Sequence, residues 1–218
     1  MLSPKTAASS RALRWLTPPA SSTSHRVVRR VQDTKCIIWE CDGRIRKRCS
    51  CSDVIYSVNV TPDGNYVAGC ANGQIYLFSP TGMLLKLLRF HNMAVLSLKV
   101  FGDGKLVSAS KDCKVCIWSP GDNPEIMNLL EHHEDVPLCV AICSNGSMAT
   151  CDLSGVMYFW ESPATDTKPA FKTDGHDKKI ACAAVRGGTQ VITASLDMTL
   201  KAWDSPCLLY TSPSPRDS

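Results

Sequence analysis

The sequence predicts an all-β fold built from one repeated unit, and the first reason is a periodic aromatic residue. A bulky ring recurs at Trp39, Phe78, Trp118, Trp160 and Trp203. The intervals between them are 39, 40, 42 and 43 residues. A period near 40 residues is typical of supersecondary units that are each too small to bury their own hydrophobic face. Arrays of this kind present surfaces more often than catalytic pockets.

The second reason is the strand pattern inside each unit. In residues 94–118, the runs Val95–Val100, Leu106–Ser110 and Lys114–Trp118 are separated by short turns rich in Gly, Asp and Lys, which is a hairpin pattern. Other runs, such as Leu138–Cys143, are apolar at every position. Strands that are covered on both faces have this composition. Small antiparallel sheets stacked face to face around an axis form a β-propeller, which is therefore the predicted architecture.

The repeat also contains a recognisable signature. The segments Ser108–Trp118 and Thr193–Asp204 resemble the signature of the WD-repeat family. The family's Gly-His pair is complete at Gly175-His176, and its histidine is matched by His91 and by His132. The offset from histidine to turn aspartate is 21 residues in the units that contain His91 and His176.

The resemblance implies a structural hydrogen-bond relay in each unit. It links the histidine before the first strand, a Ser or Thr on the second strand, the turn aspartate and the third-strand Trp. The residues at these positions are His91, Ser108, Asp112 and Trp118 in one unit, and His176, Thr193, Asp197 and Trp203 in another. Such a network ties a loop to the sheet and satisfies buried polar groups. We interpret it as structural, although it has the composition of a catalytic triad.

Two units depart from the signature. The unit that ends at Phe78 has Cys51 in place of the histidine and Asn72 in place of the aspartate. The unit that ends at Trp160 has Ser154 at the aspartate position. We therefore expect both units to lack the complete relay and to be the more mobile ones.

The chain divides into three regions. Residues 33–206 are predicted to form a partial WD-repeat propeller of about four full four-stranded blades plus part of a fifth. A common ring of seven blades needs roughly 290 residues, so we expect a fragment of a seven-bladed ring. Residues 1–32 are predicted to be disordered and basic. They are interpreted as a solvated tail, a translated leader or, from their Arg and Ser content, a mitochondrial transit peptide. Residues 207–218 resemble a translated adapter and are expected to be non-native or disordered.

Charge and cysteine content restrict the function classes. The net charge is +4, but residues 1–32 hold an excess of six positive charges, so the repeats are nearly neutral and do not favour nucleic acid. The twelve cysteines lie mostly in apolar runs, which predicts free thiols in a reducing compartment, the cytoplasm or alternatively the nucleus. No apolar stretch approaches the roughly 18 residues of a membrane span.

Possible metal or catalytic motifs are weak. Cys113 and Cys116 have metal-ligand spacing but would point to opposite faces of a predicted strand. The pair Cys49 and Cys51 lacks a second pair, and the repeat register explains His132 without a metal. No phosphate-binding loop, nucleophile elbow or zinc-protease motif is present. We expect no cofactor, no metal, no small-molecule substrate and no enzymatic activity.

The predicted function is a protein-interaction scaffold for peptide or protein partners within a larger complex. The resemblance implies a contact surface made by the residues before the turn aspartate and after the histidine. These residues form the candidate partner face: Ala71, Asn92, Met93, Lys111, Glu134, Asp135, Leu153, Lys178, Lys179 and Leu196. Charge alternates from Glu134–Asp135 to Lys178–Lys179, which favours a mixed-charge ligand. The alternatives are an RNA-associated propeller subunit that uses the basic N-terminal segment, and a propeller enzyme.

Overall fold

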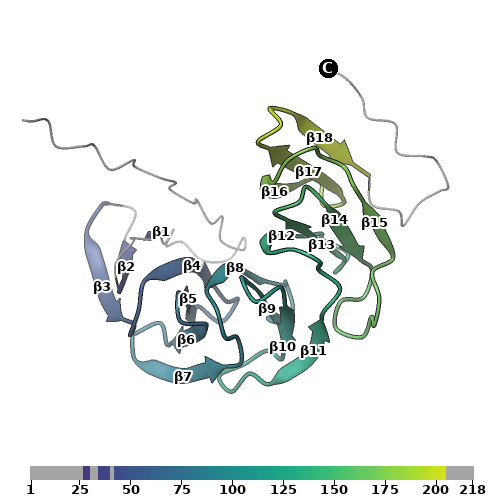
Figure 1. The fold of residues 1–218 in the computed structure, drawn as a ribbon. Helices are drawn as coiled ribbons and strands as arrows, with labels where there is room; N and C mark the ends of the chain where they lie inside the picture. Colours follow the sequence, from purple (N-terminus) through teal and green to yellow (C-terminus); the bar gives the residue numbers. More distant parts are fainter. Residues whose placement is uncertain (1–26, 30–33, 40–41, 205–218) are drawn as a thin grey trace, which may run out of the picture.

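A computed structural model describes residues 27–29, 34–39 and 42–204, and this part of the chain forms five small antiparallel sheets that follow one another along an arc (Figure 1). In each sheet the strands are paired in chain order, as in a meander. No helix in the described ranges has the length and apolarity to cross a bilayer. Of the predicted basic segment 1–32, only residues 27–29 are among the described residues, and the predicted tail 207–218 lies outside them.

The strands are short and evenly distributed along the chain. The first sheet contains β1 (Val27–Arg29), β2 (Lys35–Trp39) and β3 (Ile45–Ser50), and the second contains β4 (Ile55–Val60), β5 (Tyr66–Cys70), β6 (Gln74–Phe78) and β7 (Leu84–Arg89). The third contains β8 (Val95–Val100), β9 (Leu106–Ser110), β10 (Val115–Trp118) and β11 (Ile126–Leu130). The fourth contains β12 (Pro137–Ile142), β13 (Met148–Asp152), β14 (Met157–Trp160) and β15 (Phe171–Thr173), and the fifth contains β16 (Ile180–Arg186), β17 (Gln190–Ser195) and β18 (Leu200–Trp203).

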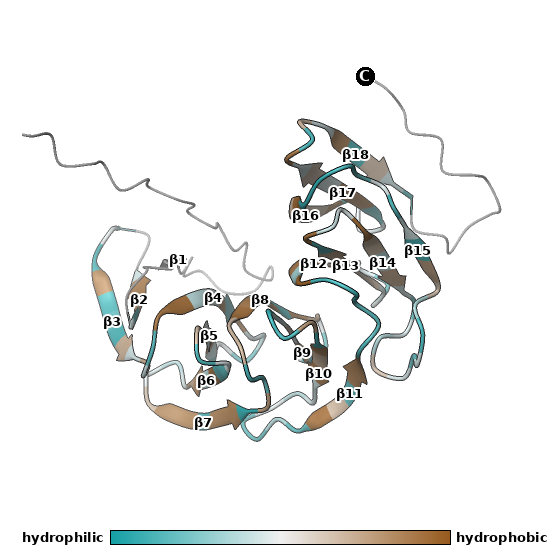
Figure 2. Ribbon diagram, in the orientation of Figure 1, coloured by the Kyte–Doolittle hydropathy of each residue, from teal (hydrophilic) through white to brown (hydrophobic). Residues whose placement is uncertain are grey.

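The core consists of four apolar layers, one between each pair of neighbouring sheets. Every residue of the second strands β5, β9 and β13 is buried, because these strands are covered on both faces. Figure 2 shows hydrophobic residues on the strands of all five sheets. The first strands β4, β8, β12 and β16 contact one another in succession. The fold is therefore a partial β-propeller, as the aromatic period predicted.

The described residues form three four-stranded sheets and one three-stranded sheet at each end of the arc. The sequence predicted about four full blades plus part of a fifth. The sheet that contains Trp203 has β18 at its edge. The first sheet gains β1, which pairs its backbone with β2 within the segment expected to be disordered. Pairing to the free edge of β2 satisfies backbone groups that would otherwise stay open.

The fifth sheet leaves one apolar face uncovered. The cross-strand register places Cys182, Ala194 and Leu200 side by side on that face, and Leu200 is 73% exposed. In the fourth sheet the corresponding face packs against the fifth, where Cys139 and Ile180 belong to one buried cluster. An open face of this kind is what an arc, unlike a closed ring, exposes at its end.

Candidate functional site

The third sheet contains a continuous hydrogen-bond relay through its interior. Trp118 donates its indole N–H to Ser108 Oγ at 2.9 Å, and Ser108 Oγ lies 2.8 Å from His91 Nε2. His91 Nδ1 lies 3.0 Å from Asp112 Oδ2. If each group donates once, His91 carries its proton on Nδ1 and accepts from Ser108. Burial lowers the pKa of His91 and outweighs the opposing effect of Asp112, so the ring is neutral near pH 7.

The relay fixes the loop before β8 onto the turn after β9. The Asp112 carboxylate accepts hydrogen bonds from the backbone N–H of Asn92 and from that of Lys114, both at 3.1 Å. Ser110 Oγ donates to the carbonyl of Met93 at 2.9 Å. Two loops that are far apart in sequence are thereby joined through buried groups. A loop held in this way loses little conformational entropy when it binds a partner.

The fifth sheet repeats the arrangement. His176 Nε2 lies 2.8 Å from Thr193 Oγ1, and Trp203 donates to the same oxygen at 2.8 Å. His176 Nδ1 lies 2.7 Å from Asp197 Oδ2. Desolvation raises the pKa of the Asp197 carboxyl, but hydrogen bonds from Thr199 and His176 outweigh it and hold the pKa well below its usual range. The structure thus brings together both sets of four relay residues expected from the sequence.

The fourth sheet has an incomplete relay, as its sequence predicted, but the structure corrects which histidine belongs to it. The relay histidine is His133, not His132: His133 Nε2 lies 2.7 Å from Thr150 Oγ1, and Trp160 donates to that oxygen at 3.0 Å. His132 instead packs edge-on against the Trp160 ring, with centroids 5.9 Å apart. The carboxylate that faces it belongs to Asp152, whose Oδ2 lies 3.6 Å from His133 Nδ1, beyond hydrogen-bond distance, so this last link of the relay is an ion-pair contact only.

Asp152 occupies a position at the end of β13 where the third and fifth sheets have Ser110 and Ser195. From there its Oδ1 accepts from the Ser154 N–H at 3.1 Å, the Ser154 hydroxyl at 2.7 Å and the Val156 N–H at 3.0 Å. Burial raises the pKa of Asp152, but its contacts with His133, Ser154 and Val156 outweigh burial and lower it. The carboxylate has moved two residues along the chain and still faces the histidine.

The second sheet lacks the relay, as its sequence predicted. Cys51 and Phe78 take the places of the histidine and the Trp and belong to one apolar cluster with Ala68. Asn72 donates through its side chain to Ser52 Oγ at 2.9 Å. Tyr76 donates its hydroxyl to the same oxygen at 2.8 Å. Asn72, Ser52 and Tyr76 therefore form a separate hydrogen-bond network at the end of this sheet, where Ser52 and Asn72 are exposed.

The candidate partner face lies at one end of the strands, and its turns share one backbone geometry. In each of four sheets the residue after the second strand donates its N–H to the loop before the first strand. The pairs are Ala71 to Val54 at 2.8 Å, Lys111 to Ala94 at 2.9 Å, Leu153 to Val136 at 3.0 Å and Leu196 to Lys179 at 3.1 Å. Asn92, Met93, Lys111, Glu134, Leu153, Lys178 and Leu196 are exposed, whereas Ala71, Asp135 and Lys179 are half-buried.

The charges on this face are less balanced than the sequence suggested. Glu134 forms an ion pair with Lys172 at 2.7 Å. Asp135 Oδ1 accepts from the Val136 N–H at 2.7 Å. The sequence did not predict the ion pair, because Lys172 comes 38 residues after Glu134. The acidic part of the expected mixed-charge surface is therefore already engaged within the chain.

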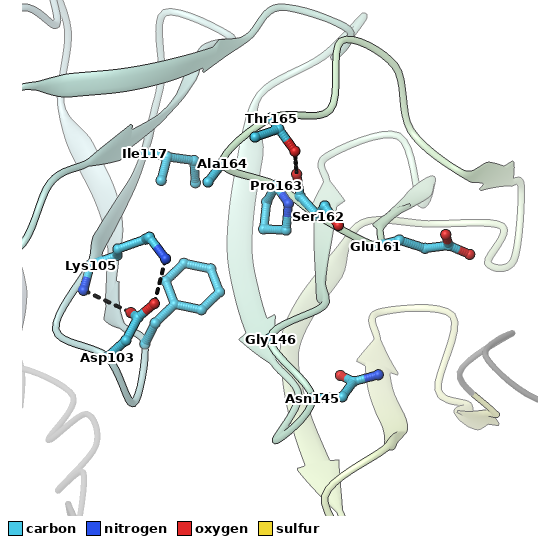
Figure 3. Close-up of a pocket in the computed structure, with 11 residues that line it drawn as sticks. Asp103, Lys105, Ile117, Asn145, Gly146, Glu161, Ser162, Pro163, Ala164 and Thr165 are labelled. Atoms are coloured by element: carbon cyan, nitrogen blue, oxygen red, sulfur yellow. Dashed lines mark hydrogen bonds and ion pairs between the residues drawn. The ribbon is translucent and has the colours of Figure 1, made fainter.

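A cavity of about 390 Å³ lies at the other end of the strands, between the third and fourth sheets (Figure 3). Asp103 and Lys105 form an ion pair at one wall. The loop after β14 forms another wall, and Asn128 holds it through the carbonyls of Pro163 and Asp166 at 2.9 and 2.8 Å. The lining includes neither His nor Cys.

The described residues include no group of three or more His, Cys, Asp or Glu side chains arranged to hold a metal. Cys113 lies in the turn before β10, with φ at +65°, not on the strand where the sequence placed it. Cys116 is buried on β10, and desolvation raises the pKa of its thiol. Cys113 therefore lies in a turn and Cys116 in a buried strand, an arrangement that does not favour a shared metal site.

Three stretches of the chain match a known protein family. The model of the family described as "WD domain, G-beta repeat" matches residues 43–79, 82–119 and 167–204, which together are just over half of the chain. The chain belongs to the WD-repeat family. Each match contains an outer strand and the three strands of the next sheet. The unmatched stretch 120–166 is the unit in which Asp152 replaces the usual turn aspartate.

Curated relatives are also WD-repeat proteins. "WD repeat-containing protein 18" of Rattus norvegicus is 29% identical over 174 residues, which cover 76% of this chain and 32% of that protein. "WD repeat and SOCS box-containing protein 1" of Xenopus tropicalis is 32% identical over 97 residues, which cover 43% of this chain and 23% of that protein. The chain spans about a third of the length of the first of these relatives.

A solved structure supports the fold alone. The computationally designed Ika8 protein superposes with a TM-score of 0.72 at 22% sequence identity, over 82% of this chain and 55% of that one. The comparisons identify no specific subfamily.

Proposed function

We propose that this chain is a protein-interaction scaffold that presents the candidate partner face to peptide or protein partners within a larger complex. WD-repeat proteins generally act in this way. The supporting observation is that the loops of this face are held in place. The same type of backbone hydrogen bond fixes the turn in each of four sheets, and in three sheets a buried histidine also ties the loop to the second strand. Rigid loops on a rigid frame bind with a small entropic cost.

The proposal assigns no enzymatic activity to the chain. Ser108, Thr150 and Thr193 have the hydroxyls that a triad would use, but all three are fully buried. Each hydroxyl oxygen also accepts an indole N–H and contacts a histidine ring nitrogen, so its hydrogen-bonding capacity is used within the sheet. A nucleophile must reach its substrate, and these oxygens do not.

Paired substitutions on the two ends of the strands test the proposal. Met93→Arg with Leu153→Arg changes two exposed side chains on the candidate partner face, whereas Met83→Arg with Ile126→Arg changes two exposed side chains away from it. The full chain is used to recover partners from native lysate, with quantitative mass spectrometry as the readout. We expect the first pair to remove partners that the second pair retains. An identical partner list for both pairs would contradict the proposal.

An RNA-associated role is the second candidate, and β3 favours it. Arg44, Arg46, Lys47 and Arg48 give this outer strand and its entry an exposed basic stretch that the sequence reasoning overlooked. Phosphate contacts make binding strongly dependent on salt. If this role holds, single-stranded RNA should bind and be lost on raising salt, and Lys47→Glu with Arg48→Glu should reduce the salt slope.

The proposal places the chain in the cytoplasm. Nine of its described cysteines are buried or half-buried free thiols, and most lie in apolar layers where a thiol acts as a small hydrophobe. Imaging a tagged full-length protein tests the compartment. Mitochondrial import of the tag would instead support the transit-peptide interpretation of residues 1–30.

A further inference from the structure

The loop between β15 and β16 presents two lysines on a fixed backbone. Gly155 accepts the His176 N–H at 3.2 Å, Ser195 Oγ donates to the Lys178 carbonyl at 2.8 Å, and Leu196 donates its N–H to the Lys179 carbonyl at 3.1 Å. Lys178 is exposed and Lys179 is half-buried. Among the described residues, no acidic group lies within ion-pair distance of either ammonium.

An exposed leucine lies on each side of this loop. Leu153 is 36% exposed and begins the turn that contains Gly155. That turn abuts the lysine loop so closely that a Cβ on Gly155 would lie 2.8 Å from the Lys178 carbonyl oxygen. Leu196 is 52% exposed. Leu153, Lys178, Lys179 and Leu196 form one continuous surface across the fourth and fifth sheets, here called the Leu–Lys strip.

The two lysines of the strip favour an anionic ligand, because the carboxylates around them are engaged elsewhere. Glu134 is paired with Lys172, Asp135 caps its own turn, and Asp197 belongs to the relay. Exposed Asp177 beside the strip offsets one of its two positive charges, and Lys111 adds another on the same face. Hydrogen bonds leave Asp135 and Asp197 charged, so the face as a whole is close to neutral, and its positive charge without an ion pair among the described residues is concentrated on Lys178 and Lys179.

We propose that the Leu–Lys strip binds an acidic peptide segment whose carboxylates lie between two apolar side chains. This inference rests on the proposed scaffold function and names the class of partner at the same face. The carboxylates pair with the two ammonium groups, and the apolar side chains cover the two leucines. Because the loop is held by three backbone contacts, binding orders few additional atoms on the protein side.

The first experiment uses two synthetic peptides and the full chain. One fluorescent peptide has two leucines flanking three acidic residues, and its counterpart has lysines in place of the acids. Fluorescence anisotropy should show binding of the acidic peptide only, weakening as salt is raised from about 50 to about 200 mM. Equal binding of both peptides, or of neither, would overturn the proposal.

Charge reversal on the strip and elsewhere locates the site. Lys178→Glu with Lys179→Glu should weaken the acidic peptide at least about tenfold, since two close charge pairs become repulsive. Lys168→Glu is the matched control, because Lys168 is exposed on the loop after β14 at the other end of the strands. Leu153→Ser with Leu196→Ser should weaken binding without changing its salt slope. An equal loss with Lys168→Glu would contradict the site, and circular dichroism of each variant checks folding.

An unbiased peptide-display selection separates this inference from the scaffold function. Enrichment of acidic peptides with flanking apolar residues supports both. Enrichment of basic or neutral peptides that still depend on Met93 and Leu153 overturns the acidic ligand and leaves the scaffold in place. A selection that enriches no peptide at all counts against both.

Discussion

The second and third sheets share one backbone plan but differ in how their interiors are satisfied. In the third sheet, His91, Ser108 and Trp118 form a buried polar chain. In the second, Cys51, Ala68 and Phe78 fill the same positions with apolar or weakly polar groups. The turn hydrogen bonds nevertheless agree within about 0.1 Å, at 2.8 Å for Ala71 and 2.9 Å for Lys111.

This agreement shows which forces set the rim geometry. The backbone pairing and the apolar layers place the turns in both sheets, with or without a relay. The relay satisfies donors and acceptors that burial would otherwise leave unpaired, and it joins the loop before the first strand to the turn after the second. A sheet without the relay avoids that obligation by placing apolar groups such as Ala68 and Phe78 at the relay positions.

Exchanging the hydroxyl between the two sheets should have the largest effect. Ser108→Ala leaves His91 Nε2 and the Trp118 N–H buried without partners, and each orphaned group costs roughly 1–3 kcal/mol, so we expect a loss of about 2–6 kcal/mol in the free energy of unfolding. The matched change Ala68→Ser adds one buried hydroxyl and should cost only about 1–3 kcal/mol. Urea denaturation measures both, and equal losses would mean that the relay is energetically silent.

The turn before the third strand offers a second exchange. Gly73 has φ +81°, and a Cβ there would overlap the His91 carbonyl oxygen, whereas Cys113 occupies the same turn position at φ +65°. Gly73→Cys should cost about 2–5 kcal/mol from left-handed strain and overpacking. Cys113→Gly relieves strain but frees the unfolded chain, so its net change should stay within about 1 kcal/mol. Thermal unfolding of the two variants compares them, and similar losses would refute the steric argument.

Lowering the pH should destabilise the loop at residues 91–94 of the third sheet but not the loop at residues 51–54 of the second. The pKa of His91 is lowered by burial, so the neutral ring stabilises the fold above about pH 6.5, the unfolded value, and this contribution is lost as the pH falls through the folded value. In the second sheet, a hydrogen bond to Cys70 and burial raise the pKa of the Cys51 thiol, so it stays neutral throughout. Hydrogen exchange at pH 7 and pH 5, corrected for intrinsic rates, should show faster exchange in residues 91–94 and no change in residues 51–54. The reverse order would contradict this account.

The same two sheets, taken with the fourth, show which features could be predicted from the sequence. Aromatic spacing predicted the fold, because sheet stacking imposes a fixed period on the chain, and the resemblance to the WD-repeat signature predicted two relays. The sequence reasoning failed in the fourth sheet, where it matched His132 to the relay histidine, although the 21-residue offset from the Ser154 position points to His133. The interval from histidine to hydroxyl is 17 residues in all three relays, and applying it selects His133 over His132. The hydroxyl lies on a strand with fixed register, while the carboxylate lies in a turn, where Asp152 reaches the ring from another position.

The charge balance of the candidate partner face could not be predicted from the sequence, for a different reason. The pairing of Glu134 with Lys172 joins a loop to an outer strand of the same sheet, and no local pattern records that contact. The exposed basic stretch around Arg46 and Arg48 was present in the sequence but was averaged away by counting net charge over the repeats. Local charge on a single strand, rather than the sum over the fold, decides what that strand attracts.

The smallest expected effect concerns the surface network that replaces the relay in the second sheet. The Tyr76 hydroxyl lies 2.8 Å from Ser52 Oγ and 2.9 Å from Gln74 Oε1. Tyr76→Phe removes these contacts from a buried ring, but Ser52 is exposed and Gln74 half-buried, so water substitutes for the lost hydroxyl and we expect a loss of about 0.5–1.5 kcal/mol. Urea denaturation measures it against Tyr56→Phe in the same sheet. A loss as large as that of Ser108→Ala would show that the surface network is a full energetic equivalent of the buried relay, and the distinction between the two sheets would then be one of location alone.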